Sequence, residues 1–127
     1  MPDKKTRILH VEDDFSLQNL VRIALERLGG YEVFTASDGF QALELARAHG
    51  ADLLLLDLDL PLRDGAATLA ALRELPALRE VPAVFLTAAA DAPARARLMA
   101  LGAREIVAKP FRPRELLRVI QRVLAKG

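Results

Sequence analysis

The sequence predicts an α/β fold in which helices cover both faces of one parallel sheet of five strands. Five short apolar runs alternate with five segments of helical periodicity, and only a few residues connect each segment to the next. Parallel neighbouring strands need right-handed crossover connections, which the intervening helices supply, so the sheet is expected to be doubly wound. With 127 residues and no cysteine, the chain has the size of one domain that buries its own core without disulfides.

The first helix lies between two runs with strand character. Residues 8–11 form a short apolar strand that ends at an acidic cluster. Apolar residues then recur at helical spacing, which predicts one buried stripe: Leu17, Leu20, Val21, Ala24 and Leu28. Gly29-Gly30 ends this helix, and residues 31–36 are predicted to form the second strand.

The third strand is the most strongly marked element. Ser37-Asp38-Gly39 opens the second helix, which ends near Gly50. Leu53–Asp57 then places four leucines before an aspartate, and such a run between turn residues is typical of a strand buried on both faces. The chain-breaking residues 60–65 follow; their aspartate can cap a third helix, which stops before Pro76.

The last two strands flank the fourth helix. Residues 83–87 form the fourth strand, and residues 91–93 supply the cap and first turn of a helix that Gly102 closes. Residues 105–108 are the fifth strand. The final helix starts at Pro113, and its predicted buried stripe comprises Leu116, Leu117, Ile120, Val123 and Leu124.

The charge balance limits the kinds of partner that the chain can attract. Eighteen basic and 17 acidic residues give a formal net charge of +1, so no overall field favours nucleic acid or membrane surfaces. The apolar stretch after the basic start is too short for a signal peptide, and no run approaches the length of a membrane span. We therefore expect a cytoplasmic protein with no direct nucleic-acid or membrane partner.

Carboxylates are expected to converge at one edge of the sheet. A doubly wound sheet of this size suits the strand order 2-1-3-4-5, in which the ends of strands one and three flank the ligand-binding crevice. Glu12, Asp13 and Asp14 follow the first strand, and Asp57 ends the third, with Asp59 just beyond. Converging carboxylates repel one another, and all-oxygen ligands favour a hard divalent cation, so Mg²⁺ or Mn²⁺ is the simplest means of neutralisation.

A hydroxyl and an ammonium group complete this predicted site. Thr87 ends the fourth strand and Lys109 follows the fifth, and both side chains can contact a phosphoryl oxygen. Taken singly, each candidate has a structural explanation: a turn or helix-capping aspartate, a solvated acidic loop, an ordinary threonine, a surface lysine. Their shared position at strand ends favours a phosphoryl-transfer site instead.

Four segments resemble the signatures of the response regulator receiver domain, the phosphoacceptor module of two-component signalling. They are Val11–Asp14, Leu56–Pro61 with Gly65, Leu86–Ala88 and Val107–Phe111. The resemblance covers essentially the whole chain, and the chain resembles the chemotaxis regulators of this family. It implies one flavodoxin-like receiver domain over residues 1–127, with an ordered core of about 6–125. Members of this family have the order 2-1-3-4-5, so that order is not an independent prediction.

The resemblance also implies roles for the site residues. A histidine kinase or phosphotransfer protein would donate a phosphoryl group to Asp57, making the chain a regulatory domain rather than an enzyme. Thr87 would contact the phosphoryl group, and Lys109 would pair with Asp57 and then with the phosphate. The implied metal ligands are Asp13 directly, Glu12 mainly through bound water, Asp57, and the main-chain carbonyl of Asp59. Asp14 extends the acidic run.

The chain departs from the family pattern three residues before Lys109. Many receiver domains carry a tyrosine or phenylalanine there, whose ring moves inward with the threonine; this chain has Ile106. We hypothesise that signalling depends more on rearrangement of the fourth helix and its loops than on burial of a ring. Asp59 is a second variation, whose side chain either is simply solvated or affects attacking water and hence the lifetime of the phosphoryl group.

Two other functions fit parts of the sequence. Haloacid dehalogenase-like phosphatases use an Asp-x-Asp at a strand end, which Asp57 and Asp59 match, but here an acidic cluster precedes the nucleophile and the chain is too short for a cap domain. A non-phosphorylated interaction module is a further alternative. A basic stripe on the last helix either is solvated or docks an acidic partner or a receiver dimer mate across helices four and five: Arg114, Arg118, Arg122 and Lys126.

Overall fold

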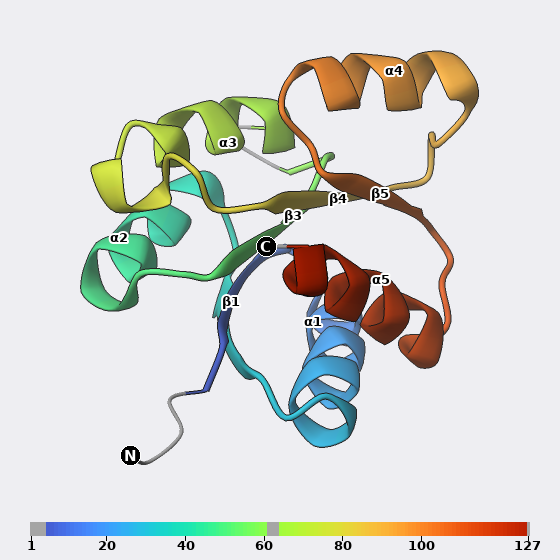
Figure 1. The fold of residues 1–127 in the computed structure, drawn as a ribbon, viewed down its shortest axis with the longest axis horizontal. Helices are drawn as coiled ribbons and strands as arrows, with labels where there is room; N and C mark the ends of the chain where they lie inside the picture. The colour runs from blue at the N-terminus through green and yellow to red at the C-terminus, as the bar shows by residue number, and fades with distance from the viewer. Residues whose placement is uncertain (1–4, 61–63, 127) are drawn as a thin grey trace.

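Five parallel strands form one sheet in the order β2-β1-β3-β4-β5 in the computed structural model, which describes residues 5–60 and 64–126 (Figure 1). The strands are β1 (Arg7–Val11), β2 (Glu32–Ala36), β3 (Leu53–Asp57), β4 (Ala83–Thr87) and β5 (Glu105–Ala108). The α-helices are α1 (Phe15–Arg22), α2 (Gly39–His49), α3 (Gly65–Arg73), α4 (Ala92–Ala100) and α5 (Pro113–Lys126). The predicted fold class and strand order are confirmed.

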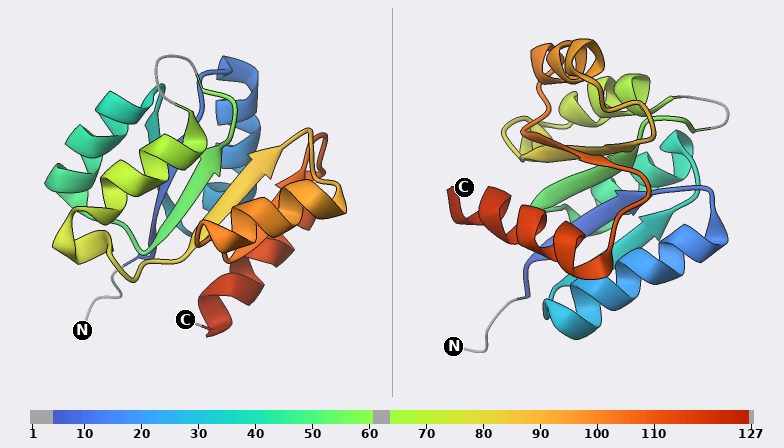
Figure 2. Two further views of the ribbon diagram at one scale, coloured as in Figure 1. Left: turned by 90° about the horizontal axis from the view of Figure 1, so that it is seen from above. Right: turned by 90° about the vertical axis from the view of Figure 1, so that its right-hand side faces the viewer.

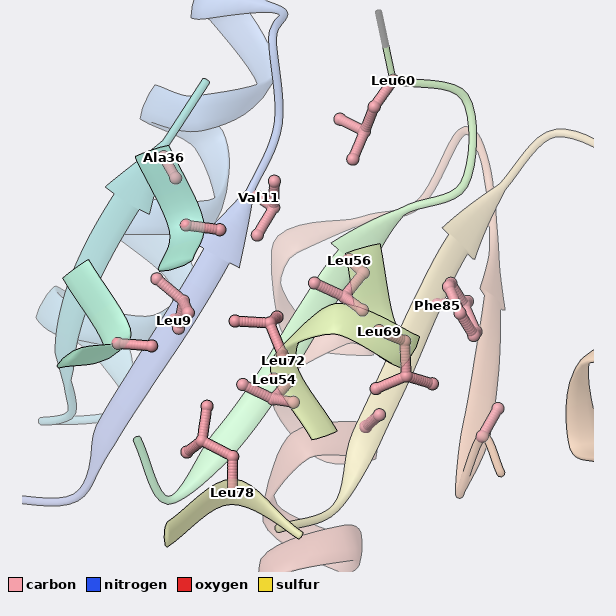
Figure 3. Close-up of a cluster of buried hydrophobic side chains, with 14 of the residues drawn as sticks. Leu9, Val11, Ala36, Leu54, Leu56, Leu60, Leu69, Leu72, Leu78 and Phe85 are labelled. Carbon is pink, nitrogen blue, oxygen red and sulfur yellow. The ribbon is translucent and has the colours of Figure 1, made fainter. Parts of the chain in front are cut away.

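The sheet separates two hydrophobic clusters. Helices α2, α3 and α4 cover one face, and α1 and α5 cover the other (Figure 2). Because successive side chains of a strand point to opposite faces, Leu54 and Leu56 enter the α2–α4 cluster (Figure 3), whereas Leu53 and Leu55 enter the α1/α5 cluster. This two-sided burial explains why β3 is a continuous run of leucines rather than an alternating pattern.

Aspartates cap four of the helices. Each side chain accepts a hydrogen bond from the main-chain N–H three residues later: Asp14 from Leu17, Asp38 from Gln41, Asp64 from Ala67, and Asp91 from Ala94. Such caps typically contribute about 1 kcal/mol each. The N-terminal caps predicted for the second, third and fourth helices are therefore present. The side chain of Asp14 caps the first helix, α1.

The structure corrects the prediction for the first helix. The α-helix ends at Arg22 and continues as a π-helical segment, η1 (Ile23–Leu28). A π-helix hydrogen-bonds five residues back rather than four, which adds residues to each turn and rotates the side chains that follow. Leu28, predicted on the buried stripe, is consequently 50% exposed.

Smaller differences concern the element boundaries. The second strand begins at Glu32 rather than at residue 31, and a short 3₁₀ turn, η2 (Pro76–Leu78), occupies the predicted connection before β4. On α5, Leu117 and Leu124 pack against the core but are only partly buried. Residues 61–63 of the predicted chain-breaking segment lie outside the described residues, as do residues 1–4 and 127.

Among the helices described, none combines the length and the apolar character that crossing a membrane requires.

Candidate functional site

Asp57 ends β3 as a buried carboxylate held by two donors. Its side chain is 2% exposed and lies on the same face of β3 as Leu55. Lys109 Nζ donates to Asp57 Oδ1 at 2.9 Å, and the main-chain N–H of Asp59 donates to the same oxygen at 3.2 Å. The two predicted partners, 52 positions apart in sequence, are thus joined directly, and the carboxylate has a fixed orientation.

Glu12 lies beside this ion pair and is equally buried, at 1% exposure. Its Oε2 accepts a hydrogen bond from the main-chain N–H of Asp14 at 3.2 Å. Its Oε1 has no hydrogen-bond partner in the described structure, although Lys109 Nζ lies 3.9 Å away and His10 Nε2 lies 4.0 Å away. Burial raises the pKa of Glu12 to about 7, and the negative charge of Asp57 adds to this, against the opposing effects of Asp14 and Lys109.

Three carboxylates could together hold a divalent cation. Glu12, Asp13 and Asp57 each offer an oxygen, and these atoms lie within 4.8 Å of one another. Asp13 is exposed while the other two are buried, so the group opens to solvent on one side. Asp59 also has an exposed side chain, and its carboxylate is not part of this group. The donor set is all oxygen, which fits Mg²⁺ or Mn²⁺.

Thr87 borders the site from β4. Asp57 pairs in register with Leu86, so Thr87 is one residue beyond that pair. The hydroxyl is buried and accepts a hydrogen bond from the N–H of Ala89 at 3.1 Å. The carbonyl oxygen of Thr87 accepts from the N–H of Lys109 at 2.9 Å, which ties the ends of β4 and β5 together.

Sequence reasoning missed His10 as a neighbour of the site. It occupies the same face of β1 as Ile8 and points in the direction of Glu12, and it is completely buried. Burial, followed by the charges of Lys109 and Arg22, lowers the pKa of His10 to about 3, so the ring is neutral at physiological pH. The alternation of residues 8, 10 and 12 along a predicted strand was a signal that could have found it.

Gln18 was also missed. Its Nε2 donates to the main-chain oxygen of Glu12 at 2.5 Å and so fixes the backbone where the acidic cluster begins. A glutamine one turn into a helix carries no pattern that would distinguish it from a solvated residue.

Glu12→Gln is expected to flatten the pH dependence of stability above pH 6.5 in the absence of metal. The folded-state pKa of about 7 lies above the ordinary glutamate pKa of 4.5, so the contribution of Glu12 is fully present below the unfolded value and is lost as the pH rises through 7. His10, whose pKa is lowered, contributes the opposite trend, mainly below the ordinary histidine pKa of 6.5. The contribution of Glu12, seen as the difference in the free energy of unfolding between the wild type and Glu12→Gln, should therefore fall by about 1 kcal/mol between roughly pH 6.5 and 8.5.

Urea unfolding in EDTA over this interval would check the expectation. Glu44→Gln makes the same chemical change on the exposed side of α2 and serves as the control. Equal slopes for the two variants and the wild type would contradict a raised Glu12 pKa.

A doubly wound sheet with clustered carboxylates, a lysine and a threonine at the carboxyl ends of its strands defines a class of small phosphoacceptor signalling proteins. The family model for the response regulator receiver domain matches residues 8–121. The chain therefore belongs to the response regulator receiver domain family, as the signature segments predicted.

Known relatives agree with this assignment. The chain is 39% identical over 121 residues to the transcriptional regulatory protein CpxR of Escherichia coli (strain K12), which covers 95% of this chain and 50% of CpxR. It is 37% identical over 121 residues to the alkaline phosphatase synthesis transcriptional regulatory protein PhoP of Bacillus subtilis (strain 168), an alignment that covers 95% of this chain and 49% of PhoP. The chain thus spans about half the length of these curated relatives.

Solved structures show the same fold. Chemotaxis protein CheY4 of Vibrio cholerae superposes with a TM-score of 0.89 at 32% identity, over 94% of this chain and 99% of CheY4. The receiver domain of the sensor histidine kinase PA1611 of Pseudomonas aeruginosa PAO1 superposes with a TM-score of 0.84 at 34% identity, over 96% of this chain and 99% of that domain. The PA1611 structure has a magnesium ion coordinated in its active-site cleft.

Proposed function

We propose that Asp57 is the phosphoacceptor of this receiver domain, in a reaction that requires Mg²⁺ or Mn²⁺. The observation that carries the proposal is the buried ion pair of Asp57 with Lys109 at 2.9 Å, placed among the carboxylates at the end of β3. The donor would be phosphohistidine of a histidine kinase or phosphotransfer protein. We take residues 1–127 as one receiver domain with an ordered core of about 6–125, acting in the cytoplasm.

The chemistry is a direct transfer to the carboxylate. An oxygen of Asp57 bonds to phosphorus as the bond from phosphorus to the donor imidazole nitrogen breaks; the nitrogen keeps the electron pair, and the product is an acyl phosphate. Lys109 and the Asp59 N–H orient the carboxylate before attack, and Lys109 can then pair with the transferred phosphoryl group. Such positioning and charge neutralisation supply most of the catalysis in phosphoryl transfer.

A divalent cation fits the site on two observations. Three carboxylate oxygens converge within 4.8 Å, and Glu12 Oε1 is buried without a hydrogen-bond partner in the described structure. Asp13 and Asp57 would bind the ion directly, Glu12 mainly through bound water, and Asp59 through its main-chain carbonyl. The bound ion would neutralise negative charge that gathers on the phosphoryl oxygens. The PA1611 receiver domain, with its magnesium ion, supports this proposal.

The proposed switch uses Thr87 and Lys109. Phosphorylation adds a charge of about −1.5 to −2, and both side chains can move toward it. Two ion pairs connect the elements that would respond: Arg95 of α4 and Arg122 of α5 both contact Glu105 of β5, at 3.0 and 3.3 Å. Glu105 is the first residue of β5 and Lys109 follows its last, so a displacement of the whole strand would reach both helices. A population shift would then expose an altered α4/β5/α5 surface to an output partner or a second receiver domain.

Ile106 bears on how this switch operates. It is 4% exposed and belongs to the α2–α4 cluster with Leu98, so it already points inward without an aromatic ring. We propose that rearrangement of α4 and its loops carries most of the signal. Amide chemical shifts with and without beryllofluoride test this; unchanged shifts across α4, β5 and α5 would defeat it.

The phosphatase alternative is not favoured. The family match assigns the chain to signalling proteins, and the side chain of Asp59, the acid/base that a phosphatase would need, is exposed rather than turned into the carboxylate group. Steady release of phosphate from a small phosphate ester would revive it.

Incubation with acetyl phosphate and MgCl₂ tests the proposed function. One phosphoryl adduct per chain should appear in the intact mass and should map to the peptide that contains Asp57. Excess EDTA should prevent its formation, because the carboxylate group then lacks the neutralising cation. No adduct with MgCl₂ present, or an adduct insensitive to EDTA, would contradict the proposal.

A further inference from the structure

His10 is a polar side chain placed where the fold would ordinarily hold an apolar one. It lies in β1 between Thr35 of β2 and Leu55 of β3, and the side chain is completely buried. Neither ring nitrogen has a hydrogen-bond partner among the described residues. Buried polar groups are nearly always paired, so an unpaired imidazole calls for an explanation that packing alone does not give.

A second buried polar atom without a hydrogen-bond partner in the described structure, Glu12 Oε1, lies near the His10 ring. His10 Nε2 lies 4.0 Å from Glu12 Oε1, the carboxylate oxygen that also has no hydrogen-bond partner in the described structure. The other nearby donor, Lys109, is 3.9 Å from this oxygen but is already bonded to Asp57 at 2.9 Å. A neutral imidazole has one N–H to donate, and a slight rotation of the carboxylate, or one bridging water, would close the gap.

We propose that His10 is a positioning residue for Glu12: its Nε2–H holds Glu12 Oε1, directly or across one water molecule, and fixes this carboxylate for divalent-cation binding. The inference rests on the proposed function, since it gives Glu12 a role toward the metal. Carboxylates that serve metal sites are themselves held by hydrogen bonds, and losing such a bond typically lowers metal affinity by about 10–100-fold. His10 lies outside the four signature segments, directly before the first of them.

Three substitutions of His10 separate positioning from space filling. His10→Gln places an amide N–H near the position of Nε2, His10→Asn places one near that of Nδ1, and His10→Leu keeps the bulk without a donor. Calorimetric titration with MgCl₂ near pH 8, without any phosphoryl donor, measures affinity while Glu12 is deprotonated. We expect about 10-fold weaker binding for His10→Leu and His10→Asn, and binding within about 3-fold of wild type for His10→Gln.

A spectroscopic readout on the wild type makes the test independent of the variants' folding. The ¹⁵N signals of the His10 ring should show the tautomer protonated at Nε2, and the Nε2 signal should shift on addition of MgCl₂. Equal Mg²⁺ affinity of wild type and His10→Leu, equal weakening by the Leu and Gln substitutions, or an Nδ1-protonated ring would each overturn the inference. Absence of Mg²⁺ binding by the wild type would instead overturn the proposed function.

Discussion

Asp57→Asn is expected to abolish formation of the phosphoryl adduct while the chain remains folded. The amide has the shape of the carboxylate but lacks a nucleophilic, ionised oxygen. The amide oxygen can still accept a hydrogen bond from Lys109, which loses a charged partner at 2.9 Å but keeps Glu12 at 3.9 Å. Removal of the Asp57 charge also removes one cause of the raised Glu12 pKa. Intact mass after incubation with acetyl phosphate and MgCl₂ measures the loss, and thermal unfolding confirms the fold.

Asp59→Asn is the matched control, because it makes the same chemical change two residues later on an exposed side chain. It should form the adduct as the wild type does. Its dephosphorylation rate also decides whether the Asp59 side chain affects phosphoryl lifetime: an unchanged rate means that the side chain is only solvated. An adduct that persists at full yield in Asp57→Asn would place the acceptor elsewhere.

Gly65→Ala is expected to destabilise the chain by about 2–3 kcal/mol and to disturb the site. Gly65 begins α3 directly against the end of β3, where its N–H donates to the carbonyl of Leu58 at 2.8 Å. A Cβ atom here would overlap the carbonyl oxygen of Asp57 and lie 2.8 Å from Leu58 Cα. Both atoms belong to the backbone and cannot rotate away, so β3 or α3 must shift and the Asp57 carboxylate with it.

The direction of the stability change caused by Gly65→Ala distinguishes a steric clash from an effect of helix propensity. Alanine normally favours a helix over glycine by about 1 kcal/mol, so a steric clash must outweigh a favourable propensity. Ala70→Gly, at an exposed position inside the same helix, supplies the reference and should cost about 1 kcal/mol. Urea unfolding and the acetyl phosphate reaction measure stability and site integrity. A Gly65→Ala chain that is more stable than the wild type would refute the close approach.

The sequence could predict the fold and much of the site because strand ends are encoded locally. The leucine run that ends at Asp57 specifies a doubly buried strand and, with it, the edge at which the carboxylate emerges. Glu12 and Lys109 follow from the same logic on other strands. Their direct contact follows from the strand order, which the family resemblance supplied.

Features decided by tertiary packing were not predictable in this way. The π-helical segment η1 breaks a regular apolar period, and it ends where Gly29 lies so close to α5 that a Cβ would come within 2.7 Å of Leu117 Cδ1. The proposed pairing of His10 with Glu12 depends on two buried atoms, the His10 Nε2 and the Glu12 Oε1, that have no other hydrogen-bond partner in the described structure. Periodicity indicates which face a residue occupies but not which polar atoms remain unpaired there.

Because side chains alternate along a strand, Asp57 and Thr87, the two strand-end residues of the proposed switch, point to opposite faces of the sheet. Asp57 shares its face of β3 with Leu55 of the α1/α5 cluster, whereas Thr87 shares its face of β4 with Phe85 of the α2–α4 cluster. In the proposed switch, the charge added at Asp57 would therefore lie on one side of the sheet, whereas α4 lies on the other. Contacts at both ends of β5 connect the two sides: the Thr87 carbonyl accepts a hydrogen bond from the Lys109 N–H at the carboxyl rim, and Glu105, at the start of β5, contacts Arg95 of α4 and Arg122 of α5. In the proposed switch, a signal from Asp57 to α4 would therefore travel along the edge strand β5 rather than through either hydrophobic core.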